Sequence, residues 1–290
     1  MKQLVVISGK GGTGKTTVTA SFVALAGQAV AVDADVDAAD LHLLLHPTVL
    51  ESGEYSGGSK AEIDGERCTH CDECRPACRF DAIGVDHRID PVACEGCGLC
   101  ARLCPVEAIE MRPALSGHWF RSETRFGPFI HAKLGVAAEN SGKLVSLIRT
   151  KATEVAQAAG KGLILIDGSP GVGCPVIASL TGCDLALAVT EPTLSGLSDL
   201  SRVAELAGHF QIPLAVAINK ADLNEAMAAG IEIFCEQKKL KVLARIPFDP
   251  AVVKSIAAGE TLVEYSTGAA ALSLRQLWER TRLELESLGT

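Results

Sequence analysis

The sequence has no long hydrophobic run, and this absence excludes several classes of protein. No apolar stretch approaches the roughly 18 residues that a membrane-spanning helix requires. The first strand-like run, Leu4 to Ile7, starts so close to Met1 that it leaves no room for a secretory signal. We therefore expect a cytoplasmic protein without stable membrane insertion.

Clusters of lysine and arginine are also missing. The chain has 27 Lys and Arg residues against 35 Asp and Glu residues, so its formal net charge is -8. The acidity is concentrated in residues 61–112, where 11 acidic side chains accompany 6 basic ones. Because nucleic acid binding relies on clustered positive charge, we expect no nucleic acid partner.

Cysteine, in contrast, is abundant. Eleven cysteines in a small secreted protein would indicate disulfides, but a chain of 290 residues without a signal sequence favours metal ligation in a reducing compartment. Eight of the cysteines lie inside residues 61–112, where two runs with the spacing Cys-x2-Cys-x2-Cys-x3-Cys repeat at an offset of 26 residues. The sequence therefore predicts a metal-binding segment built by internal repetition.

The spacing of these runs is typical of bacterial ferredoxins, in which three cysteines of each run bind one 4Fe-4S cluster and the fourth binds the other. The predicted ligands are Cys68, Cys71, Cys74 and Cys104 for one cluster and Cys94, Cys97, Cys100 and Cys78 for the second. Zinc is the alternative, but its sites usually place two Cys-x-x-Cys pairs around a single ion, which fits poorly here. Arg79 stands where the first run often has proline.

Outside this segment, short apolar runs alternate with helical stretches. Such alternation predicts an α/β fold with a mainly parallel sheet flanked by helices. The runs are Leu4 to Ile7, Ala29 to Val32, Leu163 to Ile166, Leu185 to Val189, Leu214 to Ile218 and Val242 to Ile246, with two further probable strands at His118 to Arg121 and Phe129 to Lys133. The amphipathic C-terminal stretch from Leu272 to Leu288 predicts a packed helix.

These patterns divide the chain into a discontinuous α/β domain, residues 1–60 and 113–290, and an inserted small α+β ferredoxin-like domain, residues 61–112. The Gly- and Ser-rich segment from Gly53 to Ser59 is interpreted as a linker into the insert.

A phosphate-binding loop follows the first predicted strand and opens a helix. Residues 9–16, Gly-Lys-Gly-Gly-Thr-Gly-Lys-Thr, match the pattern G-x-x-x-x-G-K-[ST] in the structural context that makes it credible. Lys15 and the backbone N–H groups would meet phosphate charge, and Thr16 would hold Mg²⁺. The residues expected to bind nucleotide here are Gly11, Gly12, Thr13, Gly14, Lys15, Thr16 and Thr17.

The additional lysine of this loop, Lys10, makes the sequence similar to one family. Residues 10–17, Lys-Gly-Gly-Thr-Gly-Lys-Thr-Thr, resemble the deviant Walker A loop of the MinD, Mrp and nitrogenase iron protein superfamily. The resemblance implies an ATPase that closes as a dimer, with itself or with a related ATPase. It also implies that Lys10 reaches the partner's nucleotide and acts there as an arginine finger would.

Two aspartates fit the same family. Asp35 follows the second predicted strand and resembles switch I, which implies that it orients the attacking water. Asp167 ends a later apolar strand and resembles the Walker B aspartate. An aspartate at such a position can be a plain helix cap, but the order of the three segments favours a catalytic set of Lys10, Lys15, Asp35 and Asp167.

The identity of the base is less clear from sequence. Asn219-Lys220-Ala221-Asp222 matches the N-K-x-D element that binds guanine in GTPases. Ile246-Pro247-Phe248-Asp249 resembles the adenine-side loop of MinD-type proteins, so we favour ATP and expect Asn219 and Pro247 to lie beside the base. GTP stays open as the alternative.

Cys174 lies seven residues after Asp167, the spacing of a cluster ligand in the nitrogenase iron protein, but no second ligand of that kind is present. We expect a structural role for it, as for Cys183 and Cys235, which we interpret as buried small apolar residues.

Three functions are compatible with the sequence. The first is an ATP-driven redox switch that gates electron transfer to a redox partner, the second a factor that delivers clusters to a metalloprotein, and the third a positioning ATPase with the ferredoxin as a docking module. We favour the first, because four cysteines per cluster indicate stable rather than labile ligation.

Overall fold

The computed structural model describes residues 1–135 and 141–288. The chain divides into two compact units. The core unit comprises Met1–Gly53, Trp119–Lys133 and Ser141–Thr290, and the insert unit comprises Glu54–His118 and Leu134–Asn140.

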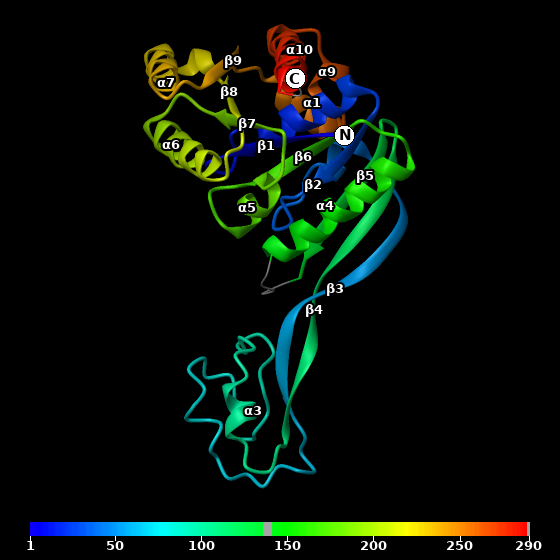
Figure 1. The fold of residues 1–290 in the computed structure, drawn as a ribbon, viewed down its shortest axis with the longest axis vertical. Coiled ribbons are helices and arrows are strands. Elements are labelled where there is room, and N and C mark those ends of the chain that lie inside the picture. Colours follow the sequence, from blue (N-terminus) through cyan, green and yellow to red (C-terminus); the bar gives the residue numbers. More distant parts are fainter. Residues whose placement is uncertain (136–140, 289–290) are drawn as a thin grey trace. The chain divides into compact units, whose positions relative to one another are not determined.

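Nine strands of the described chain form one sheet in the order β3-β4-β5-β2-β6-β1-β7-β8-β9 (Figure 1). From β5 to β9 along this order, neighbouring strands pair in parallel. The predicted α/β fold with a mainly parallel sheet is confirmed. The strands are β1 (Lys2–Ser8), β2 (Ala29–Asp33), β3 (Thr48–Ile63), β4 (Ile109–Thr124), β5 (Gly127–Leu134), β6 (Leu163–Pro170), β7 (Leu185–Thr190), β8 (Leu214–Asn219) and β9 (Lys241–Ile246).

Helices connect the parallel strands, as the crossover between two such strands requires. The helices of the described residues are α1 (Lys15–Ala26), α2 (His42–Leu45), α3 (Leu99–Leu103), α4 (Ser141–Ala158), α5 (Cys174–Leu180), α6 (Leu194–His209), α7 (Glu225–Gln237), α8 (Ala251–Ala258), α9 (Leu262–Tyr265) and α10 (Ala269–Ser287), with the 3₁₀ turn η1 at Ala221–Leu223.

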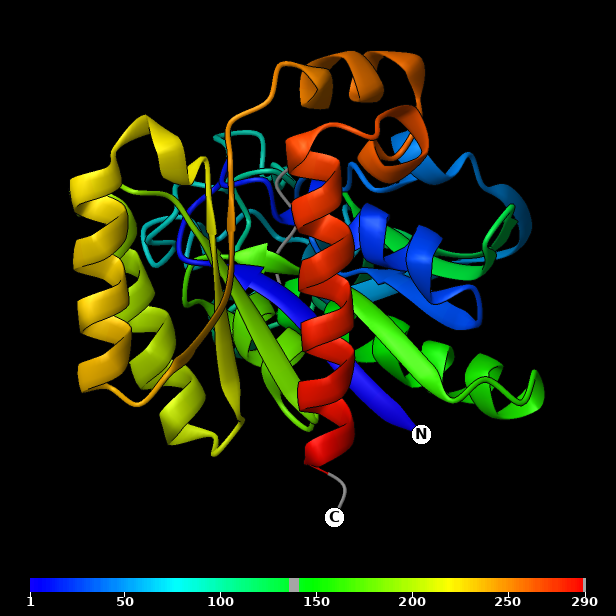
Figure 2. The same ribbon diagram turned by 90° about the horizontal axis from the view of Figure 1, so that it is seen from above.

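The core of the first unit lies between the sheet and its helices. Side chains alternate between the two faces of a strand, so Leu4 and Val6 of β1 share a core with α1 and α10, while Val5, which is equally buried, points to the opposite face. The rings of Phe22 and Trp278 lie 5.0 Å apart where α1 and α10 pack side by side (Figure 2). The C-terminal helix is therefore packed, as predicted, and begins three residues earlier, at Ala269.

The predicted linker from Gly53 to Ser59 is wrong, because this segment lies inside β3. Gly53 is needed for packing rather than for flexibility: a Cβ at this position would lie 2.6 Å from Nε1 of Trp119. The pairing of β3 with β4 also moves the edges of the insert. The compact insert unit begins at Glu54 and extends to His118, whereas the sequence places the insert at residues 61–112.

The internal repeat reappears in the hydrogen bonds of the insert unit. Asp64 N–H donates to the carbonyl of Ala108, and Asp90 N–H, 26 residues further on, donates to that of Ala82. Both alanines are buried, in keeping with their place in the repeated Ala-Ile pair. The insert unit is thus built from two equivalent halves that bond to each other.

Candidate nucleotide site and cysteine-lined cavities

The loop between β1 and α1 carries the predicted phosphate-binding glycines. Gly12 and Gly14 have φ angles of 79° and 92°, in the left-handed region that glycine tolerates best. A Cβ on Gly14 would also lie 2.3 Å from Nδ2 of Asn219. Because α1 begins at Lys15, the unpaired N–H groups of its first turn belong to this loop and can bind an anion.

The ammonium group of Lys15 is buried between two carboxylates. Its Nζ lies 3.1 Å from Oδ1 of Asp167 and 3.4 Å from Oδ2 of Asp35. Burial lowers the pKa of Lys15, but the charges of Asp167 and Asp35 together outweigh it and raise this pKa above its ordinary value. Lys15 is therefore a cation whose charge is maintained by carboxylates at the point where the loop joins α1.

Hydroxyl groups of α1 meet the same carboxylate. Thr16 Oγ1 donates to Oδ2 of Asp167 at 2.7 Å, and Thr19 Oγ1 donates to Oδ1 at 3.0 Å. A threonine hydroxyl and a carboxylate are hard oxygen ligands of the kind that Mg²⁺ prefers. The predicted magnesium ligand Thr16 and the Walker B aspartate are thus brought together, and their chemistry fits the ion.

Asp33 was not among the predicted site residues, although the structure places it in the centre of this charge cluster. It is fully buried, and its carboxylate accepts the backbone N–H groups of Asp35 at 3.1 Å and Leu41 at 3.0 Å. Burial and the neighbouring charge of Asp167 raise the pKa of Asp33 well above its ordinary range. The signal in the sequence is that Asp33 directly follows an apolar run, as Asp167 does. In the structure Asp33 ends β2, Asp167 lies inside β6, and the two residues pair across these strands.

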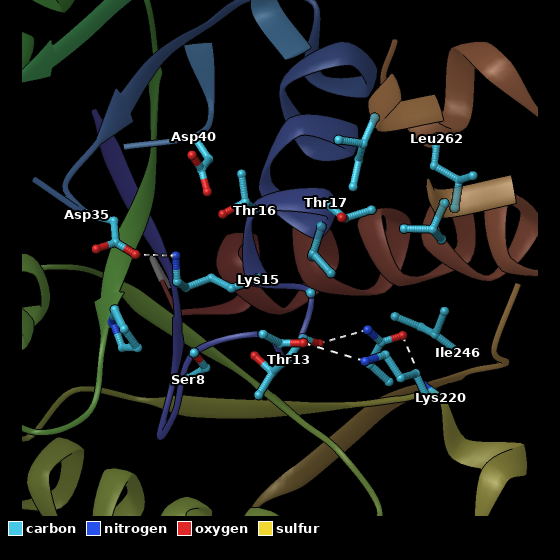
Figure 3. A pocket seen from close by; sticks show the side chains of 18 of the residues that line it. Ser8, Thr13, Lys15, Thr16, Thr17, Asp35, Asp40, Lys220, Ile246 and Leu262 are labelled. Carbon is cyan, nitrogen blue, oxygen red and sulfur yellow. Dashed lines mark hydrogen bonds and ion pairs between the residues drawn. The ribbon is translucent and has the colours of Figure 1, made fainter. Parts of the chain in front are cut away.

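A cavity of about 590 Å³ opens beside the loop (Figure 3). Its lining is polar around Lys15, Thr16 and Asp35 and apolar around Ile246 and Leu262, which suits the phosphates and the base of a nucleotide. The predicted nucleotide residues that line it are Gly11, Gly12, Thr13, Gly14, Lys15, Thr16, Thr17, Asp35, Asn219 and Pro247. Asp167 does not line the cavity, but its carboxylate accepts hydrogen bonds from Lys15 and Thr16, which do.

Lys10 does not line the cavity. Its Nζ lies 3.1 Å from Oγ of Ser195 and 3.4 Å from Oε2 of Glu191, both of which follow β7. The other oxygen of Glu191 lies 2.5 Å from Nζ of Lys220. Glu191 therefore holds two lysines next to the phosphate loop, a role that no local pattern in the sequence indicated.

The N-K-x-D segment ties together the loops on the side of the base. Asn219 Nδ2 donates to the carbonyl of Thr13 at 2.8 Å. Oδ1 of Asp222 accepts the backbone N–H of Phe248 at 2.6 Å and so fixes the loop that follows β9. Both residues thus contribute to the shape of the cavity, whichever base it binds.

The cysteines of the insert unit surround two separate cavities. One is lined by Cys68, Cys71, Cys74 and Cys104, and the other by Cys78, Cys94, Cys97 and Cys100. Each cavity therefore receives three cysteines from one run and the fourth from the other run, as the spacing predicts. The backbone N–H of Ala108 donates to Sγ of Cys104 at 3.2 Å, a contact of the kind that stabilises a ligating thiolate.

Each cavity is lined by four thiols, the number that one 4Fe-4S cluster takes as ligands. Among residues 1–135 and 141–288, no three His, Cys, Asp or Glu side chains converge on one point, as a tetrahedral zinc ion requires.

The cysteines of the core unit differ in exposure. Cys174 is exposed at the start of α5. Cys183 and Cys235 are buried, and burial raises the pKa of each thiol to about 11. Both therefore remain protonated and pack as small apolar side chains.

A strand, a glycine-rich loop with its lysine, and a helix, set in a parallel sheet, define the chain as a P-loop nucleotide-binding protein. Residues 4–263 match the CobQ/CobB/MinD/ParA nucleotide binding domain, and the chain belongs to this family. No helix within the described part of the chain combines the length and apolar character needed to cross a bilayer.

Three known proteins illustrate the similarity. The uncharacterized protein MJ0578 of Methanocaldococcus jannaschii is 34% identical over 283 residues, 97% of this chain and 96% of that protein. The septum site-determining protein MinD of Pyrococcus horikoshii, complexed with Mg-ADP, has a TM-score of 0.59 at 19% identity and covers 99% of this chain and 98% of its own, which shows a shared fold. Pyruvate synthase subunit PorD of Methanothermobacter marburgensis is 44% identical over 52 residues, 18% of this chain and 64% of PorD.

Replacing Lys15 by methionine should destabilise the nucleotide-free protein at pH 8 by about 3–5 kcal/mol, because the buried carboxylates lose their cation. The raised pKa of Lys15 means that its contribution is complete below about pH 10.4, the unfolded pKa, and so constant between pH 5 and 8. Burial raises the pKa of Asp33 and Asp35 even though the charge of Lys15 opposes the shift. Without Lys15 both pKa values should rise further, so the folded variant binds more protons than the unfolded chain. Stability of the variant should therefore recover as the pH falls.

Urea unfolding at pH 8 and pH 5.5 measures this difference. Lys241→Met is the matched control: Lys241 is exposed and paired with Glu284, and its loss should cost less than about 1 kcal/mol at both values. An equal deficit for Lys15→Met at both pH values would contradict the role assigned to the carboxylates.

Proposed function

We propose that the chain is an ATP hydrolase in which nucleotide-driven dimer closure is coupled to two 4Fe-4S clusters and gates electron transfer to a partner protein. The observation that carries the proposal is the arrangement of eight cysteines as two sets of four, each around its own cavity. The unit that contains these cysteines is inserted into the chain between Asp35 and Asp167. The cysteine-lined cavities therefore lie between two residues of the nucleotide site along the chain.

Family membership and the cavity support ATP as the nucleotide. The similar MinD structure of Pyrococcus horikoshii contains Mg-ADP, and the cavity beside the phosphate loop has a polar and an apolar part. In the proposed complex, phosphate oxygens take over part of the contact that Lys15 makes with the carboxylates of Asp35 and Asp167. The lysine therefore remains charged and paired with negative groups. Asn219 and the loop of Pro247 lie at the base.

Hydrolysis then depends on positioning and charge. Thr16 and Asp167 hold Mg²⁺, which neutralises charge on the phosphates when it is bound. Asp35, 3.4 Å from Lys15, orients the attacking water, and Asp33 keeps Asp35 in place by accepting its backbone N–H. Lys10 stabilises charge on the nucleotide of the partner subunit, for which it must leave Glu191 and Ser195.

Each cluster supplies a one-electron transfer site. Cys68, Cys71, Cys74 and Cys104 hold one, and Cys94, Cys97, Cys100 and Cys78 hold the other. Ligation by four cysteines each favours retained clusters over delivery, because a carrier requires labile ligands. The local similarity to PorD, a subunit of pyruvate synthase, supports a redox role for the cysteine-rich segment.

Anaerobically purified protein should contain about eight iron atoms in two 4Fe-4S centres. Iron and acid-labile sulfide analysis with low-temperature paramagnetic resonance measures this. Substitution of the last cysteine of the first run tests the ligand assignment. Cys78→Ser should alter the same resonance as Cys97→Ser, although Cys78 and Cys97 belong to different runs. Cys174→Ser is the control and should leave both resonances unchanged. Zinc in place of iron, or a shared resonance for Cys78→Ser and Cys71→Ser, would contradict the assignment.

Lys10→Ala and Lys15→Ala chains should each be inactive as ATPases alone and regain activity when mixed. A mixed dimer contains one composite site with Lys15 from one chain and Lys10 from the other. Random pairing then predicts about a quarter of wild-type turnover. The comparison is a mixture of Lys220→Ala and Lys15→Ala chains. Every chain of that mixture keeps Lys10, the lysine proposed to act across the interface. If demonstrably mixed Lys10→Ala and Lys15→Ala dimers stay inactive, Lys10 does not act across an interface.

ATP binding should shift the cluster potentials. A typical coupling free energy of about 1–3 kcal/mol corresponds to roughly 40–130 mV for one electron, and reduction must change ATP affinity by the same factor, about 5- to 150-fold. The measurement is a redox titration with and without a non-hydrolysable ATP analogue. Lys15→Ala, which should not bind the analogue, is the control. Potentials that stay within about 10 mV at saturating nucleotide would instead favour a docking or carrier role for the insert.

A further inference from the structure

One cation of the insert unit lies directly against a cluster-ligand loop. Lys60, near the end of β3, is half-buried, and its Nζ donates to the backbone carbonyl of Cys94 at 2.5 Å. Cys94 is the first ligand of the second set and is itself buried. The hydrogen bond therefore holds the ammonium group at the backbone of Cys94, the residue whose side chain supplies the ligating sulfur.

The neighbouring backbone holds this contact in place. A Cβ on Gly96 would lie 2.1 Å from the carbonyl oxygen of Ser59, and Gly96 has a φ angle of 65°. The strand segment Ser59–Lys60 thus packs on the loop between Cys94 and Cys97 so closely that only glycine fits. The position of Lys60 relative to the second set of cysteines is set by this packing as well as by its own hydrogen bond.

The first set of cysteines has a different charge environment. Its cavity is lined by the acidic residues Asp72 and Glu73. Two cations of this part of the insert unit are paired, Arg75 with Asp72 and Arg67 with Glu110. Within residues 1–135 and 141–288, Lys60 forms no ion pair, so its charge is not offset, although Glu95 lines the second cavity.

Net charge and hydrogen bonding around a cluster set its reduction potential. One-electron reduction adds one negative charge to the cluster and its four thiolates, and a fixed cation nearby favours the reduced form. Because the unpaired ammonium group of Lys60 lies against a loop of the second set, the two clusters should not be equivalent even though the sequence repeat makes their ligands equivalent.

We propose that Lys60 raises the reduction potential of the cluster held by Cys78, Cys94, Cys97 and Cys100, and so makes the two clusters of the insert unequal. This inference rests on the proposed iron-sulfur function. Lys60 acts through charge, as a tuning residue outside the ligand set, and not as a ligand.

The test is a redox titration of the full-length protein with dithionite as the electron donor, each cluster being monitored by its paramagnetic resonance. Lys60→Gln should make reduction of one cluster about tenfold less favourable, which lowers its potential by about 59 mV. Lys60→Met should do the same, and Lys60→Arg, which keeps the charge, should restore most of the wild-type value. The affected resonance should be the one altered by Cys97→Ser.

Arg112→Gln is the matched control, because it removes one positive charge from the same unit at a residue that pairs with Glu62 and lines neither cavity. It should leave both potentials unchanged. Equal shifts in Lys60→Gln and Arg112→Gln, or no shift in Lys60→Gln with full iron content, would overturn the proposal.

Iron content separates the remaining outcomes. Loss of half of the iron in both neutral variants but not in Lys60→Arg would overturn the tuning role, since Lys60 would then be needed to build the site. Wild-type protein without 4Fe-4S resonances would instead overturn the proposed function itself.

Discussion

The ion pair between Lys15 and Asp167 is the contact on which the nucleotide site depends. Strands β2, β6 and β1 are neighbours in the sheet, so their carboxyl ends bring Asp33, Asp167 and the phosphate loop together. The buried carboxylates of Asp33 and Asp167 and the partly buried one of Asp35 would repel one another without a cation. Lys15 supplies it, and the hydroxyl groups of Thr16 and Thr19 donate to the two carboxylate oxygens of Asp167. These contacts hold the ammonium group of Lys15 next to the phosphate loop, where it can meet the charge of a phosphate group.

Asp33 connects this charge cluster to the segment that precedes the insert. Its carboxylate fixes the backbone of Asp35 and of Leu41, and α2 and β3 follow Leu41 directly in the chain. A change in the charge around Asp33 therefore acts on the residues that lead into β3. This chain of local contacts is the physical reason to expect that nucleotide binding and the state of the insert influence each other.

Local patterns in the sequence predicted the parts of the molecule that are determined locally. Apolar runs predicted the parallel strands, and cysteine spacing predicted which four thiols surround each cavity. The Gly- and Ser-rich segment that starts at Gly53 is not a linker because it lies inside β3, and Gly53 itself is required by a distant partner, the indole ring of Trp119. Glu191 and Lys60 were missed because their partners lie in other loops, and no spacing rule records such contacts. Asp33 follows an apolar run, but its place in the charge cluster depends on its pairing with Asp167 of another strand.

The apolar core of the insert unit is small and contains its own cysteines. It consists of Ala61, Cys74, Ala82, Ile83, Cys94 and Ile109, with partly buried neighbours. A core of this size contributes little stability by itself, so the free energy of ligand binding becomes folding free energy. The core unit, in contrast, buries large side chains such as Phe22, Phe129 and Trp278. For the iron-sulfur protein proposed above, iron starvation would leave a folded core unit and an insert unit that is unfolded and open to proteases, and the lifetime of the protein would then follow iron supply.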